Sequence, residues 1–125
     1  MNKEQFEKGL AIRRSVVGEA YVEASLRAAD DFSMPMQELV TEFCWGEVWS
    51  RPGLDRRSRS ILNLGMIAAL NRPEELATHV RGAINNGVTK EEIKECFLQV
   101  AVYVGMPAGL GCFKIARQVF KDMGI

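Results

Sequence analysis

Histidine is nearly absent from this sequence, and cysteine is scarce and scattered. The 125 residues contain one histidine, His79, and three cysteines, Cys44, Cys96 and Cys112. No two cysteines form a Cys-x-x-Cys pair, and no cysteine and histidine share the spacing of a zinc site. We therefore expect no bound metal, and we expect three reduced thiols that are mostly buried.

An excess of either charge is also missing. The 16 lysines and arginines balance 16 aspartates and glutamates, so the formal net charge is zero. No overall field favours nucleic acid or a membrane surface, and recognition of an anion must come from local clusters of charge. Residues 1–5 are polar, and no apolar stretch behind them is long enough for a signal peptide or a membrane span. We expect a cytoplasmic protein that binds neither nucleic acid nor membrane.

Strand patterns, internal repeats and linkers are missing as well. Glycine and proline occur mainly between segments with helical spacing, which predicts an all-α fold. The lack of linkers and repeats predicts one domain over residues 1–125. The clearest helix follows Thr89 and Glu92, which fit a capping box ahead of apolar residues at helical spacing. Gly105 and Pro107 separate this helix from the last one. We predict six or seven helices, at about residues 3–16, 18–29, 35–50, 55–70, 73–86, 89–104 and 108–123.

One of these helices has almost no polar side chains. Within residues 61–70 only Asn63 is polar, so the segment is apolar on every side and must be covered by protein all round. A single small chain has difficulty covering it while six other helices also need cover. We therefore expect a symmetric homo-oligomer that buries this helix at a subunit interface.

Residues 41–60, TEFCWGEVWSRPGLDRRSRS, concentrate aromatic and charged side chains. Glu42, Trp45 and Trp49 fall on one side of the expected helix. If that side lines a pocket, its low polarity disfavours the charged form of Glu42 and suits the carboxyl group to donate a proton. In the alternative interpretation, the tryptophans are core or interface anchors and Glu42 pairs with an arginine. The composition alone favours neither.

Arginines follow the aromatic residues. Asp55 is a suitable N-cap, but Arg56, Arg57 and Arg59 then lie in the first turns of a helix, where the dipole favours negative charge. Guanidinium groups and the free amides of a helix start can together hold a carboxylate or phosphate, and Arg51 is close enough in sequence to join them. The alternative is that these arginines form salt bridges to acidic neighbours across an interface or are solvated.

His79 lies at the border of the apolar face of its helix. A lone histidine in this setting is more often structural than catalytic, yet it is the one side chain with an unperturbed pKa near 7. Gly87 fits the end of the same helix, in a left-handed conformation. Residues 103–108 join the last two helices, and the free amides at the start of the final helix can face a ligand.

Three separated motifs then form a pattern. They are WGEVWSRPGLDRRSRS, HVRGAINNGVTKEEIKE and AVYVGMPAG, in that order along the chain. Together they resemble the 4-carboxymuconolactone decarboxylase family, relatives of the AhpD-like alkylhydroperoxidases, over about residues 13–120. The peroxidase relatives carry a Cys-x-x-Cys pair shortly before the histidine, whereas residues 72–79 here read RPEELATH. A disulfide-cycling peroxidase needs both thiols, so this departure argues against peroxidase activity.

The resemblance implies an AhpD-like helical domain assembled as a homo-oligomer, commonly a hexamer. It also implies decarboxylation of 4-carboxymuconolactone to 3-oxoadipate enol-lactone in protocatechuate catabolism, without metal or organic cofactor. On this basis His79 is the first catalytic candidate and Glu42 the second. The resemblance assigns the substrate's carboxylates to three arginines and the walls of the site to three aromatic residues: Arg51, Arg57, Arg59, Trp45, Trp49 and Tyr103.

Two alternatives remain open at this point. One is a non-enzymatic helical oligomer that binds a small carboxylic acid or a partner protein. The other is a family member with a different lactone substrate, or with redox chemistry through Cys44 or Cys112.

Overall fold

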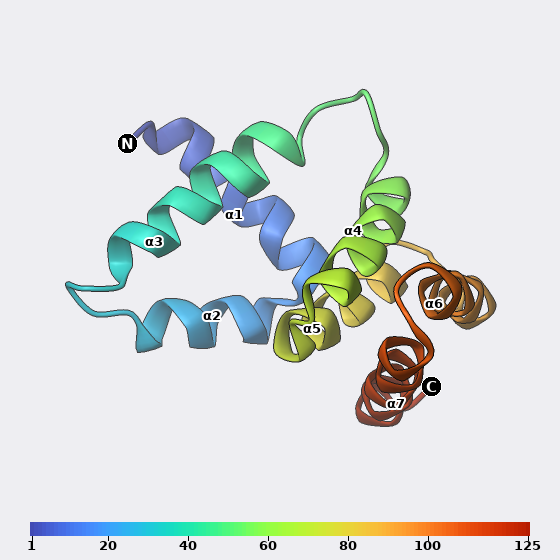
Figure 1. Ribbon diagram of the computed structural model, residues 1–125. Coiled ribbons are helices and arrows are strands. Elements are labelled where there is room, and N and C mark those ends of the chain that lie inside the picture. Colours follow the sequence, from blue (N-terminus) through green and yellow to red (C-terminus); the bar gives the residue numbers. More distant parts are fainter. The chain divides into compact units, whose positions relative to one another are not determined.

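The computed structural model describes all residues, 1–125, and contains helices and turns with no strand, as predicted (Figure 1). The chain packs as two compact units, Met1–Asp55 and Arg56–Ile125, called unit 1 and unit 2 below. Unit 1 contains α1 (Lys3–Val17), α2 (Glu19–Ala28), α3 (Met34–Leu39) and the π-helix η1 (Val40–Val48). Unit 2 contains α4 (Arg56–Leu70), α5 (Pro73–Asn85), α6 (Lys90–Tyr103) and α7 (Met106–Met123).

Unit 1 is built on a close approach of α1 to η1. An added Cβ at Gly9 would lie 1.9 Å from the Thr41 carbonyl oxygen, and one at Gly46 would lie 2.5 Å from the Gln5 carbonyl oxygen. Only glycine permits backbones to approach this closely. Around this contact the unit buries an apolar core of seven residues: Leu10, Ile12, Val16, Val17, Val22, Trp45 and Trp49.

The prediction of a single α-helix over residues 35–50 is wrong, because most of this segment has the hydrogen bonds of a π-helix. The structure divides it into the short helix α3 and the π-helix η1, in which, for example, the Trp49 N–H bonds to the Cys44 carbonyl, 3.0 Å away. This wider segment is the one whose Thr41 carbonyl lies against Gly9. The prediction that Glu42, Trp45 and Trp49 share one side of the helix is confirmed. These three residues are buried, whereas Phe43 and Val48 are about half exposed.

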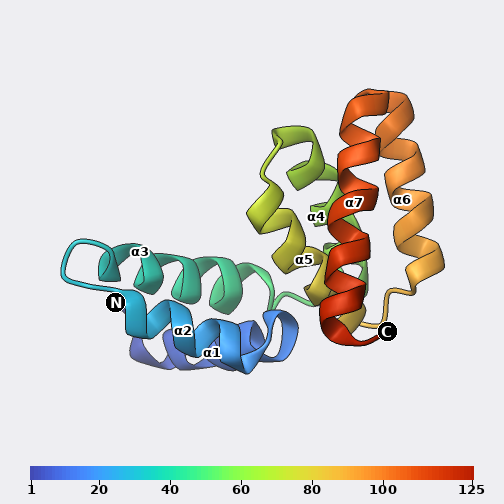
Figure 2. The ribbon, with the colours of Figure 1, turned by 90° about the horizontal axis from the view of Figure 1, so that it is seen from below.

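Unit 2 follows the predicted helix signals closely. Thr89 and Glu92 form the expected capping box of α6, and Gly87 has the expected left-handed conformation, with a φ of 89°. Helix α7 begins at Met106, two residues before the predicted start, because a proline fits within the first helical turn. In Figure 2, α6 and α7 run side by side, and the two helices pack together. The core between the four helices is apolar and includes Leu64, Val80, Ile93 and Phe97.

Helix α4 has a buried apolar face and an exposed apolar face. Leu64 and Ala68 are buried in the core of unit 2, whereas Leu62, Met66 and Leu70 are 47–69% exposed. The exposed side chains recur every four residues and so lie on one face of the helix. No helix of the structure combines the length and the apolar character that crossing a membrane requires.

Candidate active site

His79 lies in unit 2, on the side of α5 that packs against α4. It is half-buried, and its Nδ1 lies 3.4 Å from Nδ2 of Asn63, on α4. Burial lowers the pKa of His79 below its ordinary value, and the Glu75 carboxylate opposes this with a smaller effect. The imidazole is therefore neutral near pH 7.

A second polar contact fixes the packing of α4 against α5. Nδ2 of Asn86 donates to Oγ of the fully buried Ser60, 2.9 Å away, and to the carbonyl of Arg56, 3.3 Å away. The two helices are therefore joined by polar contacts at two levels, one turn of α4 apart. This arrangement holds Asn63 opposite His79.

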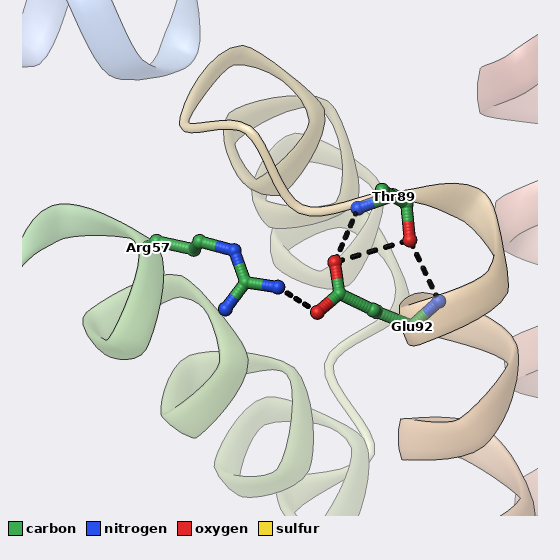
Figure 3. Close-up of polar contacts among 3 residues, drawn as sticks. All are labelled: Arg57, Thr89 and Glu92. Carbon is green, nitrogen blue, oxygen red and sulfur yellow. Dashed lines mark hydrogen bonds and ion pairs between the residues drawn. The ribbon is translucent and has the colours of Figure 1, made fainter.

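Two of the three arginines at the start of α4, Arg57 and Arg59, were predicted to bind substrate. Arg57 forms an ion pair with Glu92 at the start of α6, and the other carboxylate oxygen of Glu92 accepts bonds from the N–H and the hydroxyl of Thr89, each 3.0 Å long (Figure 3). The guanidinium of Arg57 thus connects α4 to α6 and has a carboxylate partner within unit 2. The alternative to substrate binding was a salt bridge across an interface, whereas this ion pair lies within unit 2.

Arg59 has a different position. It lies four residues before Asn63, and residues four apart are neighbours on one face of a helix. The half-buried side chain of Arg59 therefore starts from the face of α4 that meets His79. The binding roles of Arg57 and Arg59 stay predictions.

Tyr103, predicted as a wall of the site, lies at the end of α6 and is 83% exposed. With α4 it borders a hollow of about 330 Å³, which is also lined by Ile61, Gly65, Cys96 and Val100. The hollow is mostly apolar and suits the carbon skeleton of a small ligand. The role of Tyr103 as a wall stays a prediction.

The other predicted residues lie in unit 1. Glu42 is 6% exposed, and its Oε1 accepts a hydrogen bond from the backbone N–H of Asn2, 2.8 Å away, while its carbonyl accepts one from Nε2 of Gln5. The rings of Trp45 and Trp49 stack with centroids 4.7 Å apart inside the core. Arg51 is exposed. The catalytic role of Glu42 and the binding roles of these three residues stay predictions.

Two polar residues were missed as candidates in the sequence. Arg13 is 6% exposed in unit 1, where its Nη1 donates to Oε1 of Gln37 at 2.9 Å and to Oγ1 of Thr41 at 3.1 Å, and burial lowers its pKa. The signal for its burial was its spacing, because it falls on the apolar face of α1 with Leu10 and Val17. Asn63 was recognised as the one polar residue of an apolar helix, but its contact with His79 was not predicted.

The three thiols take no part in a disulfide. Cys112 is buried, whereas Cys44 and Cys96 are half-buried, so only Cys112 fully meets the expectation of buried thiols, and their reduced state stays a prediction. Burial raises the pKa of each thiol, which disfavours the reactive thiolate form.

An all-helical chain with a half-buried histidine on α5 and several arginines in the first turns of the neighbouring helix α4 suits a class of proteins that act on small organic anions. Residues 35–118 match the Carboxymuconolactone decarboxylase family, and the chain belongs to this family. It is 46% identical to a 4-carboxymuconolactone decarboxylase of Acinetobacter baylyi over 100% of this chain and 94% of the relative. It is also 46% identical to a nitrosuccinic acid decarboxylase of Metarhizium robertsii, over 98% of this chain and 86% of the relative.

Proposed function

We propose that this protein is a carboxy-lyase that converts 4-carboxymuconolactone to 3-oxoadipate enol-lactone in protocatechuate catabolism. The observation that carries the proposal is the 46% identity, along the whole length of the chain, to a 4-carboxymuconolactone decarboxylase, and the half-buried position of His79 supports it. The family match begins in unit 1 and ends in unit 2, which supports treating residues 1–125 as a single domain. The cytoplasm is the location we expect for such a catabolic enzyme.

The substrate itself supplies most of the chemistry. When the bond between the ring carbon and the leaving carboxylate breaks, CO2 departs and the electron pair moves through the ring alkene to the lactone carbonyl oxygen. The resulting dienolate takes up a proton on the carbon next to that carbonyl and becomes the enol-lactone. Because the lactone is its own electron sink, the reaction needs no organic cofactor, and the protein has to bind the anion, stabilise the developing negative oxygen and allow protonation.

The residues of unit 2 match these tasks. Arg59 binds a substrate carboxylate with its guanidinium, and His79 interacts with the reacting lactone. The apolar hollow beside Tyr103 accommodates the ring. Arg57 contributes positive charge at the start of α4 while it stays paired with Glu92. In unit 1, Glu42 is proposed as a further acid, and Arg51, Trp45 and Trp49 as binding residues.

A second substrate is favoured by the other relative. Nitrosuccinic acid also carries two carboxylates, and loss of CO2 beside its nitro group leaves an electron pair that the nitro oxygens accept. Both reactions therefore place negative charge on an oxygen and end with protonation of carbon. The 46% identity to a nitrosuccinic acid decarboxylase makes this the alternative substrate to test.

The test is a comparison of CO2 release from freshly generated 4-carboxymuconolactone and from nitrosuccinate. We expect rapid turnover of the lactone and slow or no turnover of nitrosuccinate. Faster turnover of nitrosuccinate than of the lactone would show that nitrosuccinate is the better candidate for the substrate. Thermal stabilisation by both acids without turnover of either would instead support a non-enzymatic binding protein.

We further propose that the protein is a homo-oligomer, with six subunits as in the known members that it resembles. The support is the exposed apolar side chains of unit 2, which include Leu62, Met66, Val102 and Leu110, each 47–73% exposed. Isolated exposed apolar residues are ordinary, but an apolar face that continues along a helix indicates contact with protein. Light scattering should show a multimer for the wild type and smaller species for the Leu62→Glu variant.

A further inference from the structure

A groove lies between α6 and α7, apart from the residues of the candidate active site. The two helices pack side by side (Figure 2), and the groove contains a hollow of about 200 Å³ within unit 2. Its apolar lining residues are three or four apart along each helix, and residues at that spacing lie on one helix face. They are Ile93 and Phe97 on α6, and Phe113, Ala116 and Phe120 on α7. The facing sides of the two helices therefore form an apolar floor.

Three aromatic rings make up most of this floor. The rings of Phe97 and Phe113 meet edge to face, with centroids 6.3 Å apart. Phe97 is fully buried, whereas Phe113 and Phe120 are half-buried and keep part of their surface accessible. Aromatic rings attract a further ring through offset-stacked or edge-on contacts. The floor therefore suits the flat ring of a small ligand.

The rim of the same groove is positively charged. Lys90 and Lys94 border it from α6 and Arg117 borders it from α7, and all three are exposed. Glu91 is the one acidic residue of the lining, and it is paired with Lys94 at 2.5 Å. The ion pairs of the structure include neither Lys90 nor Arg117, and the Lys90 ammonium lies over the ring of Phe120, 5.3 Å from its centroid. The rim therefore carries positive charge that no carboxylate of the chain balances.

We propose that this groove is a binding site for a small aromatic carboxylate, with its ring against Phe113 and Phe120 and its carboxylate paired with Arg117. A guanidinium can form two parallel hydrogen bonds with a carboxylate. An inorganic anion would use the rim alone, and a neutral ring would use the floor alone, whereas an aromatic carboxylate uses both. The volume of about 200 Å³ is smaller than that of pockets for drug-sized ligands and limits the ligand to about one ring. The site does not involve His79 and does not depend on the proposed function.

The probe for this site is benzoate, and saturation-transfer NMR of the ligand detects weak binding to the full-length protein. We expect benzoate to bind with a dissociation constant of about 1 mM. Cyclohexanecarboxylate keeps the charge without the aromatic ring, and benzamide keeps the ring without the charge, so each should bind at least about 5-fold more weakly. No saturation up to about 10 mM benzoate, or equal binding of the three compounds, would overturn the proposal.

Arg117→Met tests the charged part of the site. Methionine keeps an unbranched side chain and removes the guanidinium, so the dissociation constant for benzoate should rise about 10-fold. The matched control is Lys114→Met, which removes a positive charge from an exposed position of α7 outside the groove and should change the constant less than about 2-fold. An unchanged constant in Arg117→Met, or equal increases in both variants, would contradict the proposal.

Two further measurements separate this site from the other roles proposed for unit 2. Arg59→Met should leave benzoate binding unchanged, because Arg59 does not line the groove. Loss of benzoate binding in Arg59→Met would place the ligand at the proposed active site and overturn the assignment to the groove. Light scattering should give the same mass for Arg117→Met and the wild type. A smaller species for Arg117→Met would show that the groove is a contact between copies of the chain, which would also overturn the proposal.

Discussion

Unit 1 buries two charged side chains, Arg13 and Glu42, whereas the polar exception in the buried core of unit 2 is the neutral Ser60. In unit 1 the guanidinium bonds to Gln37 and Thr41, and the carboxylate accepts from the backbone of Asn2. Buried charges with such specific hydrogen bonds hold a fold in one arrangement.

Unit 2 places its polar groups differently. Its core is apolar, and His79, whose pKa is lowered by burial, is half-buried where two helices meet. Three arginines, Arg56, Arg57 and Arg59, lie in the first turns of α4. The comparison shows that the two units hold their ionisable groups differently, buried and hydrogen-bonded in unit 1 and half-buried at a helix contact in unit 2.

The largest effect is expected from Gly9→Ala in unit 1. The added methyl group would lie 1.9 Å from the Thr41 carbonyl oxygen and 2.7 Å from the Gly46 nitrogen. Because both are backbone atoms, the α1–η1 contact must open, and the free energy of unfolding should fall by about 3 kcal/mol. Urea unfolding followed by circular dichroism measures the change.

The control for Gly9→Ala is Gly111→Ala in α7 of unit 2. No atom lies within 4 Å of an added Cβ there, and alanine is the better helix former, so stability should rise by up to about 1 kcal/mol. Equal unfolding midpoints for Gly9→Ala and the wild type would show that the glycine contact is not what holds unit 1 together.

An intermediate effect is expected at the arginines of unit 2. Loss of a charge-assisted bond to a substrate carboxylate costs about 1.5–3 kcal/mol, so Arg59→Met should raise KM roughly 10- to 100-fold. Arg57→Met removes a guanidinium already paired with Glu92 and should raise KM less than about 3-fold. Steady-state kinetics give the KM of both variants. A larger rise in KM for Arg57→Met than for Arg59→Met would assign binding of the substrate carboxylate to Arg57.

The smallest effect is the dependence of stability on the protonation of His79. Burial lowers the pKa of His79 in the folded protein, whereas the unfolded chain keeps a value near 6.5. As pH falls below that value the unfolded state binds the proton first, so stability is complete above pH 6.5 and declines as pH falls toward the folded-state pKa. The slope in this window should be less than about 1.4 kcal/mol per pH unit. His79→Gln should remove that part of the slope, and an unchanged slope in this variant would assign it to other groups.

Much of the fold was predictable because its signals are local. The capping box at Thr89 and Glu92 and the left-handed Gly87 depend on neighbouring residues, and both are present as predicted. The π-helix was not predictable, because the spacing of Glu42, Trp45 and Trp49 identifies a buried face and not the hydrogen bonds that close each turn.

The candidate site was harder to predict because its contacts join distant residues. Nothing in the sequence near Arg57 indicates Glu92 as its partner, and nothing near Asn63 indicates His79. These pairs exist because α4 packs against both α5 and α6. The residue types predicted an anion site, and the packing was needed to find that Arg57 pairs with Glu92.

The most direct test of this account is the decarboxylation of freshly generated 4-carboxymuconolactone by His79→Gln beside the wild type and Glu42→Gln. Glutamine at position 79 keeps a polar side chain of similar size but cannot act as an imidazole, and glutamine at position 42 still accepts the Asn2 hydrogen bond. We predict that His79→Gln lowers kcat at least about 100-fold with the helical content and unfolding midpoint preserved. Full activity in folded His79→Gln protein, with activity lost in Glu42→Gln, would contradict the assignment of the chemistry to His79 and transfer it to Glu42.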